Sequence, residues 1–395
     1  MPIPFDPKTH LAYAPPESRI MMEELGKAGE GIAPVGITQP FPLLSEEGVK
    51  ALREEIFCPR ILDKFTHTTA LAPCQIRGMS CRPGVATFNE ALWTHPETIR
   101  AVSEAAGIDL VPIIPYELGH VNVQLTFGAE TLSKLGREPL RAEASVIRQE
   151  SVVPKIVPGF NNLPPLVPST DSDTESEGGT DLLSPISPHD KKPEPIVADA
   201  AALPPPESEP KNEHNPVVGW HRDSYPWVCV VMLSDATTMQ GGETALTCAD
   251  GSVKKVRGPQ MGWAIMLQGR YIDHVALGAC GAPERVTMVT SYRAKDVMLP
   301  DDSVLTTIRP MVNFNELYYE WSTYRLDLLS ERFKKQSDSL KKKRGDGQGP
   351  WGEEVVKKDE FKAWCREQIK YLQDEFKAWC REQIKYLQTT IDEMV

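Results

Sequence analysis

The sequence predicts an α+β protein whose core is an antiparallel jelly roll with helices flanking it at both ends. Short β-type runs separated by Gly, Pro and Asp turns follow residue 215, whereas helical patterns precede residue 150 and follow Asn313. With 395 residues and 41% hydrophobic content, the chain is long enough to bury a core of its own.

Residues 1–150 are expected to form an N-terminal helical region and the first strands of the barrel. Ser45 can cap a helix that begins at the following residue, and residues 98–107 have the pattern of a second helix. Residues 119–127 alternate apolar and polar side chains, as a half-buried strand does. The polar face of that strand consists of His120, Asn122 and Gln124.

Residues 151–215 differ in composition from everything around them. They contain many prolines, among them Pro204–Pro206, and an acidic Ser/Thr tract at 171–177. Such a segment buries too little apolar surface to offset the entropy cost of ordering it. We therefore expect a disordered insertion that interrupts the domain without adding a second core.

The jelly-roll core is expected at residues 216–312 and C-terminal helices at residues 313–395. Strands are predicted at the β-type runs 227–233, 243–248, 262–267 and 286–292. In the C-terminal part, residues 359–373 are repeated without change at 374–388, which indicates a recent duplication or a sequence-assembly error. Fifteen residues overshoot four helical turns by about 60°, so one copy at most fits a given groove. Packing on the same domain is favoured, and a homodimer through this helix is the alternative.

The composition limits the classes of function that the protein can have. A net charge of -12 argues against nucleic-acid binding, which needs a basic surface. No apolar run approaches the length of a membrane span, and the first residues lack a signal-peptide pattern. The eight cysteines form no Cys-x-x-Cys pair, so reduced thiols are expected. Together these features favour a soluble, cytoplasmic protein.

The most informative motif is His221-Arg222-Asp223, followed by His274 and Arg285. If a strand begins at this motif, His221 and Asp223 point to the same face and Arg222 points away. Two imidazoles and a carboxylate can form three ligands of an open iron centre. A lone His-x-Asp is weak evidence, but the later histidine and arginine follow in the order that such a centre needs.

The segment from residue 215 to 296 resembles the iron(II)/2-oxoglutarate-dependent oxygenases, in particular the prolyl-hydroxylase-like branch. That branch has a Gly-Gly-Glu-Thr hairpin between the second and third ligands, which stands here at residues 241–244. Residues 219–226 and 267–274 look more particularly like a fungal group of these enzymes, some of which act in secondary metabolism. The resemblance implies a double-stranded β-helix, or cupin-like, fold.

The resemblance also implies roles for individual residues. His221, Asp223 and His274 would bind iron(II), and Arg285 would bind the distal carboxylate of 2-oxoglutarate. Thr287, two residues further on the same strand face, could add a hydrogen bond. Arg293 is the rival anchor, but eight residues of strand span about 26 Å, so it cannot share a site with Arg285.

The implied reaction uses iron(II), 2-oxoglutarate and O2 to oxidise a small molecule, such as an amino acid or a secondary metabolite. It releases succinate and CO2, and the outcome is hydroxylation, desaturation or oxidative cyclisation. Asn122, Gln124 and Tyr225 are candidate substrate contacts, although a solvent face is at least as reasonable for the first two and core packing is favoured for Tyr225. The alternative function is a catalytically inactive jelly-roll binding or scaffold protein. A kinase is excluded, because Val228 occupies the place of the required asparagine.

Overall fold

The computed structural model describes most of the chain outside one long segment. The described residues are 3–67, 74–125, 134–141, 218–308, 314–345, 356–373, 387–389 and 391–392. Contacts divide the chain into two units, residues 1–147 with 213–395 and residues 148–212. The second unit, and the whole of the predicted insertion at 151–215, lie outside the described residues.

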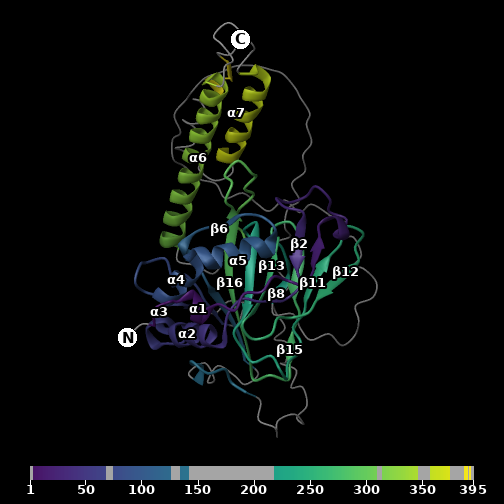
Figure 1. The fold of residues 1–395 in the computed structure, drawn as a ribbon, viewed down its shortest axis with the longest axis vertical. Coiled ribbons are helices and arrows are strands. Elements are labelled where there is room, and N and C mark those ends of the chain that lie inside the picture. The colour runs from purple at the N-terminus through teal and green to yellow at the C-terminus, as the bar shows by residue number, and fades with distance from the viewer. Residues whose placement is uncertain are drawn as a thin grey trace, which may run out of the picture. The chain divides into compact units, whose positions relative to one another are not determined.

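Helices α1 to α5 alternate with strands β1 to β7 in the first part of the chain, and α6 and α7 follow the last strand, β16 (Figure 1). Ser45 caps α2 as predicted, because its Oγ accepts a hydrogen bond from the backbone N–H of Gly48 at 3.0 Å. The α-helices are α1 (Pro7–His10), α2 (Glu46–Ile56), α3 (Pro59–Phe65), α4 (Thr87–Thr94), α5 (Pro96–Ala106), α6 (Phe314–Gly345) and α7 (Lys358–Gln373), and the 3-10 helices are η1 (Glu23–Leu25) and η2 (Pro115–Glu117).

The strands form a large sheet, a smaller sheet and a short two-stranded ribbon, and the paired strands are antiparallel. The large sheet has the order β1 (Arg19–Met21), β2 (Val35–Thr38), β13 (Trp263–Leu267), β9 (Trp227–Met232), β16 (Glu284–Ala294), β7 (His120–Leu125), β5 (Gln75–Ile76) and β4 (Thr66–His67), with β3 (Phe41–Pro42) beside β13 and β6 (Leu110–Pro112) beside β16. The smaller sheet has the order β12 (Val253–Val256), β11 (Thr244–Thr247), β14 (His274–Ala276) and β8 (Val218–His221), and the ribbon joins β10 (Gln240–Gly241) to β15 (Ala279–Cys280).

The large sheet is buried on both faces, and strand alternation decides which residues lie on which face. On β9, Cys229 and Val231 belong to a core cluster that also contains Leu52 of α2 and Trp93 of α4. Val228 and Val230, which alternate with them along β9, belong instead to a cluster with side chains of the smaller sheet. Helices therefore cover one face of the large sheet and the smaller sheet covers the other.

The sheet structure confirms a mixed helical and antiparallel-strand fold, with the predicted strands present at β7, β9, β11, β13 and β16. The N-terminal strands β1 and β2 were not predicted. β2 contains a glycine and is buried along its whole length, so its residues show no alternation of polar and apolar side chains. The jelly-roll connectivity remains a prediction.

The helices α6 and α7 lie side by side (Figure 1). The rings of Phe333 on α6 and Trp364 on α7 meet edge to face, with their centroids 5.3 Å apart. Cys365 and Ile369 of α7 belong to the same core cluster as Leu328 of α6. The first copy of the repeat, residues 359–373, thus packs within this chain. The second copy lies outside the described residues except for its last two positions, and the homodimer through it stays a prediction.

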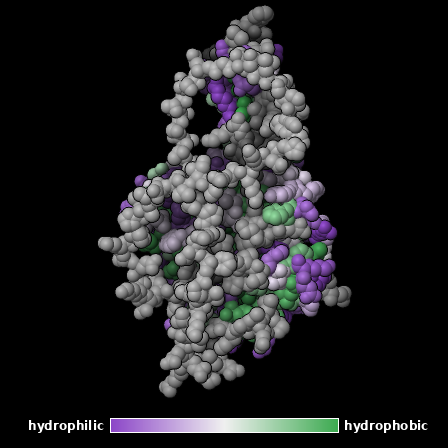
Figure 2. Space-filling model, turned by 180° about the vertical axis from the view of Figure 1, so that it is seen from behind, coloured by the Kyte–Doolittle hydropathy of each residue, from purple (hydrophilic) through white to green (hydrophobic). Residues whose placement is uncertain are grey.

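None of the helices in the described ranges is both long enough and apolar enough to cross a membrane. On the face shown in Figure 2, hydrophilic and hydrophobic residues are intermixed over the coloured part of the surface.

Candidate metal centre

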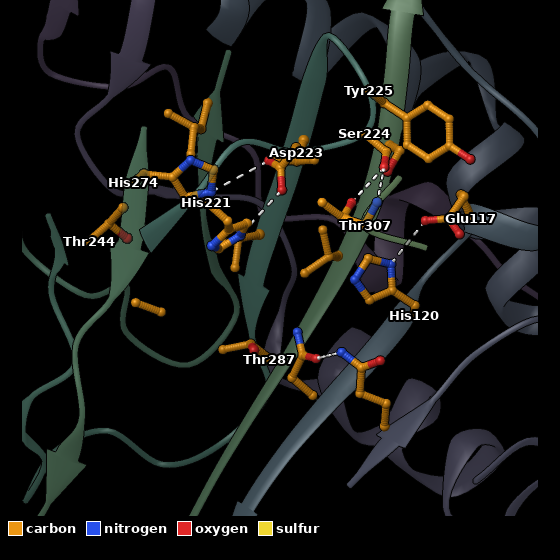
Figure 3. A pocket seen from close by; sticks show the side chains of 18 of the residues that line it. Glu117, His120, His221, Asp223, Ser224, Tyr225, Thr244, His274, Thr287 and Thr307 are labelled. Atoms are coloured by element: carbon orange, nitrogen blue, oxygen red, sulfur yellow. Dashed lines mark hydrogen bonds and ion pairs between the residues drawn. The ribbon is translucent and has the colours of Figure 1, made fainter. Parts of the chain in front are cut away.

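A pocket of about 250 Å³ lies between the large sheet and the smaller sheet. Figure 3 shows two histidines and an aspartate on one side of this pocket and the pair Glu117 and His120 on another. Apolar side chains of the large sheet also line this pocket, namely Val228, Val230, Ile265, Leu267 and Val289.

His221 and His274 are direct partners across the pair β8 and β14. Their ring centroids are 4.4 Å apart, and the planes are tilted by 51°. Opposed residues of antiparallel strands carry their side chains on the same face of the sheet. The sheet register therefore brings together two histidines that are separated by more than fifty positions in the sequence.

Asp223 lies just beyond the end of β8, where its backbone N–H donates to the carbonyl of Gly269 at 2.9 Å. Its Oδ1 is 3.6 Å from His221 Nε2, and its Oδ2 is 3.6 Å from His274 Nε2. One ligand atom from each of these residues lies within 4.8 Å of the others. The intervening Arg222 is half-exposed and pairs with Asp273 at 2.8 Å, so it points away from the group as predicted.

Backbone carbonyls orient both imidazoles. Nδ1 of His221 lies 2.7 Å from the carbonyl oxygen of Gly219, and Nδ1 of His274 lies 2.9 Å from that of Ile272. In the neutral imidazole, such a carbonyl holds the proton on Nδ1 and leaves the lone pair on Nε2. Both Nε2 atoms face Asp223, so both lone pairs are directed to one point.

The charges at this point suit a cation. Burial would raise the pKa of the Asp223 carboxyl, but the imidazoles of His274 and His221 lower it below its usual value. Burial lowers the pKa of His274, although Asp223 opposes this shift. The aspartate is therefore ionised and His274 neutral at pH 7, the states in which each binds a metal.

The residues fit a bound metal ion. Asp223 Oδ2 is buried and has no hydrogen-bond partner among the described residues. A buried carboxylate oxygen without a partner is costly, and a cation at the focus of the two Nε2 atoms would satisfy it. Only glycine fits at position 269, because a Cβ there would lie 1.8 Å from this oxygen. Two histidines and one carboxylate on one side of an ion leave its other positions open.

Arg285 and Thr287 of β16 line the same pocket on the same strand face. Arg285 is 8% exposed, its Nε is buried without a hydrogen-bond partner, and no described carboxylate forms an ion pair with it. Burial lowers its pKa to about 10, so it is still a cation at pH 7. A Cβ on Gly242, whose φ is +77°, would lie 3.6 Å from Arg285 Nε, so the glycine hairpin passes close to the guanidinium.

Arg293, the rival anchor, does not line the pocket. Its guanidinium lies over the ring of Tyr324, 5.7 Å from the centroid, and donates to the carbonyl of Ala294 at 2.9 Å. The length of β16 thus separates the two arginines in the way that the strand rise predicts.

The three candidate substrate residues lie in different surroundings. Asn122 lines the pocket and accepts a hydrogen bond from Gln75. Tyr225 also lines the pocket, is 2% exposed and packs in a cluster with Trp321 of α6. Gln124 does not line this pocket but a smaller cavity beside Arg285. The single polar wall expected from Asn122 and Gln124 is therefore divided between two cavities.

Sequence reasoning missed two charged residues of the pocket, Arg77 and Glu117. Arg77 Nη2 donates to Glu117 Oε2 at 3.1 Å, and both side chains are almost completely buried. His120 Nδ1 lies 3.5 Å from the same carboxylate oxygen. Burial lowers the pKa of His120, and the charge of Arg77 lowers it further. Burial would raise the pKa of Glu117, but Arg77 and His120 lower it.

No family model and no curated protein matches the sequence. Among solved structures, the chain is similar to IDO from Bacillus thuringiensis, with 14% identity, a TM-score of 0.17, and coverage of 20% of this chain and 39% of that one. It is also similar to a prolyl-4-hydroxylase (P4H) from Pseudomonas putida, with 22% identity, a TM-score of 0.16, and coverage of 20% and 45%. The chain spans less than half the length of either structure.

Proposed function

We propose that the protein is an iron(II)- and 2-oxoglutarate-dependent oxygenase that oxidises a small molecule on a double-stranded β-helix core. The observation that carries the proposal is the convergence of His221, Asp223 and His274 in the pocket that also holds Arg285. Among the described residues, Asp223 Oδ2 has no hydrogen-bond partner and Arg285 forms no ion pair. A metal site beside a buried arginine suits a cosubstrate that carries two carboxylates.

The three ligand residues would hold iron(II) through the two Nε2 atoms and one carboxylate oxygen. Iron(II) supplies the redox chemistry that couples O2 reduction to the oxidative decarboxylation of 2-oxoglutarate. For hydroxylation, the balance is that substrate R–H, 2-oxoglutarate and O2 give R–OH, succinate and CO2. The carbonyls of Gly219 and Ile272 keep each imidazole in the tautomer and orientation that metal binding requires.

Arg285 would bind the distal carboxylate of 2-oxoglutarate, and the hydroxyl of Thr287 would donate a further hydrogen bond to it. A guanidinium buried to 8% exposure interacts strongly with a carboxylate, because little water screens the charges. The apolar wall around Val228 and Ile265 keeps water away from the reacting atoms. Which of the three outcomes occurs, hydroxylation, desaturation or cyclisation, depends on where the substrate is held against this wall.

The experiment is a turnover assay on protein purified without oxygen. On addition of iron(II), 2-oxoglutarate and O2, we expect succinate to form, and we expect His274→Ala to remove both succinate formation and iron(II) binding by calorimetry. His95→Ala is the control, since His95 lies outside the pocket at the start of α5. Binding of iron(II) or 2-oxoglutarate without succinate would favour the inactive binding protein, and equal effects of the two variants would show that the ligands are misassigned.

A further inference from the structure

The wall of the pocket formed by Arg77 and Glu117 lies away from the proposed cosubstrate anchor. On β16, Arg285 is four residues from Val289, and Val289 pairs with His120 of β7. Four strand residues span about 14 Å. Arg77 Nη2 lies 3.5 Å from His120 Nδ1, so Arg77 and Arg285 approach the pocket from opposite ends of this strand segment.

Several polar atoms of this wall have no hydrogen-bond partner among the described residues. They include Nε and Nη1 of Arg77 and Oε1 of Glu117, and these side chains are 5% and 1% exposed. The hydroxyl of Tyr225 and Oε1 of Gln75, which line the same pocket, are also without partners. A buried charged group that lacks partners is costly, so the wall is complementary to a ligand that supplies them.

The unpartnered atoms are of two opposite kinds. The unpartnered atoms of Arg77 are hydrogen-bond donors, for which a carboxylate is the best acceptor. The unpartnered atom of Glu117 is an acceptor, for which an ammonium is the best donor. A ligand with only one of these charges would leave the other side chain unsatisfied. Because Arg77 and Glu117 are themselves 3.1 Å apart, the two groups of the ligand must be close neighbours. An α-amino acid carries a carboxylate and an ammonium on one carbon and meets this requirement.

Aliphatic side chains line the pocket beside this wall. Val289 pairs with His120, Val230 pairs with Val289 and Ile265 pairs with Val230, so these residues continue in one row across the large sheet from the charged wall. Figure 3 shows the His–Asp–His group on a different side of the pocket from Glu117 and His120. An aliphatic side chain would be buried favourably against these aliphatic residues. It would then extend from the charged wall toward the metal ligands, where oxidation takes place in the proposed reaction.

We propose that the substrate is a free aliphatic α-amino acid, with its carboxylate on Arg77 and its ammonium on Glu117. This inference rests on the proposed oxygenase function for the fate of the bound amino acid, but not for its binding. Arg77 and Glu117 are binding residues in this scheme, and Asp223, His221 and His274 hold the reacting end of the pocket.

Calorimetry on the full chain, loaded with iron(II) and 2-oxoglutarate without oxygen, tests the binding. The probes are the aliphatic standard amino acids, including proline, in both enantiomers, and the corresponding carboxylic acids that lack the amine. We expect at least one amino acid to bind more tightly than its amine-free counterpart. Arg77→Gln should weaken that binding by about 30- to 100-fold, as the loss of a charge-assisted hydrogen bond predicts. The control is Arg82→Gln, because Arg82 is an exposed arginine of the neighbouring loop, and it should bind like the wild type.

Glu117→Gln gives an independent readout, because it should remove the preference for the amino acid over its amine-free counterpart. If Arg77→Gln does not fold, this preference and the wild-type comparison still decide the question. The proposal is overturned if no amino acid binds, if the amine makes no difference to the wild type, or if Arg77→Gln and Arg82→Gln bind equally well. Amino-acid binding without succinate formation would instead contradict the oxygenase function, but it would still support amino-acid recognition by Arg77 and Glu117.

Discussion

Arg53 of α2 and Glu284 of β16 form an ion pair in which neither side chain is exposed to solvent. Two hydrogen bonds join them, Nη1 to Oε1 at 2.8 Å and Nη2 to Oε2 at 3.1 Å. Arg53 Nη1 also donates to the carbonyl of Leu233 at 3.1 Å. Glu284 directly precedes Arg285, so this pair holds the end of β16 that carries the proposed cosubstrate anchor against the helical layer.

Removing Arg53 alone should be strongly destabilising. Arg53→Leu leaves the Glu284 carboxylate buried without its counter-charge, and we expect a loss of about 3 to 5 kcal/mol in the free energy of unfolding. The double variant Arg53→Leu with Glu284→Leu should be more stable than Arg53→Leu, because no buried charge remains. Urea unfolding measures both. A double variant that is no more stable than Arg53→Leu would contradict the coupling.

Substitution of Gly269 should damage the metal site through sterics alone. A Cβ at this position would lie 1.8 Å from Asp223 Oδ2, so in Gly269→Ala the carboxylate has to move. We expect iron(II) affinity to fall by about 10-fold or more, which is the usual loss when a metal ligand is no longer held in its position. Gly219→Ala is a matched control, because a Cβ there meets nothing within 4 Å. Equal metal affinities of the two variants, measured by calorimetry, would count against Asp223 as a ligand.

Arg285 and Arg293 should differ in their effect on 2-oxoglutarate binding. Arg285→Gln removes the buried cation of the pocket, and we expect the Kd of 2-oxoglutarate to rise by about 100-fold. Arg293→Gln removes an arginine that packs on Tyr324 outside the pocket, and its Kd should stay close to that of the wild type. The measurement is calorimetry in the presence of iron(II). A larger effect of Arg293→Gln would reverse the assignment.

Glu320 should make stability depend on pH. This residue of α6 is 6% exposed, and burial raises its pKa from 4.5 to about 7, although the backbone N–H of Tyr116 donates to it and opposes the shift. A carboxyl with a raised pKa favours the folded state when protonated. Its contribution is therefore complete below pH 4.5 and is lost as the pH rises through 7, by up to about 3 kcal/mol.

The variant Glu320→Gln cannot ionise and isolates this effect. The difference in unfolding free energy between the wild type and Glu320→Gln should change between pH 4.5 and pH 7, with the wild type losing stability relative to the variant. Urea unfolding at several pH values gives the difference directly. A difference that stays constant over this range would show that Glu320 titrates normally in the folded state.

The sequence predicted those parts of the molecule that depend on local periodicity. Alternation along β16 placed Arg285 and Thr287 on one face and indicated that Arg293 lies too far away. Strand alternation also predicted that His221 and Asp223 point in the same direction. In the structure β8 ends at His221, and the hydrogen bond from the Asp223 N–H to the Gly269 carbonyl holds Asp223 in place beyond the strand end. The importance of Gly269 could not be predicted, because its contact depends on packing between distant segments.

The place of Arg77 and Glu117 in the pocket could not be predicted from the sequence either. Arg77 follows a strand of two residues, and Glu117 ends a 3-10 helix of three residues. Segments this short have no periodicity from which a face can be assigned. Only the pairing of β5 with β7 brings Arg77 to Glu117 and His120.

β8 is the last strand of the smaller sheet in the described part of the chain, and its only described neighbour there is β14. An edge strand opens locally more easily than a central one. Because the proposed metal ligand His221 lies on β8 and its partner in the register, His274, lies on β14, an ion held by both would cross-link the edge to the sheet. Fraying of this edge and release of the ion would then be a single event. Amide exchange at Trp220 and His221 would slow on loading, and its rate would report the residence time of the metal.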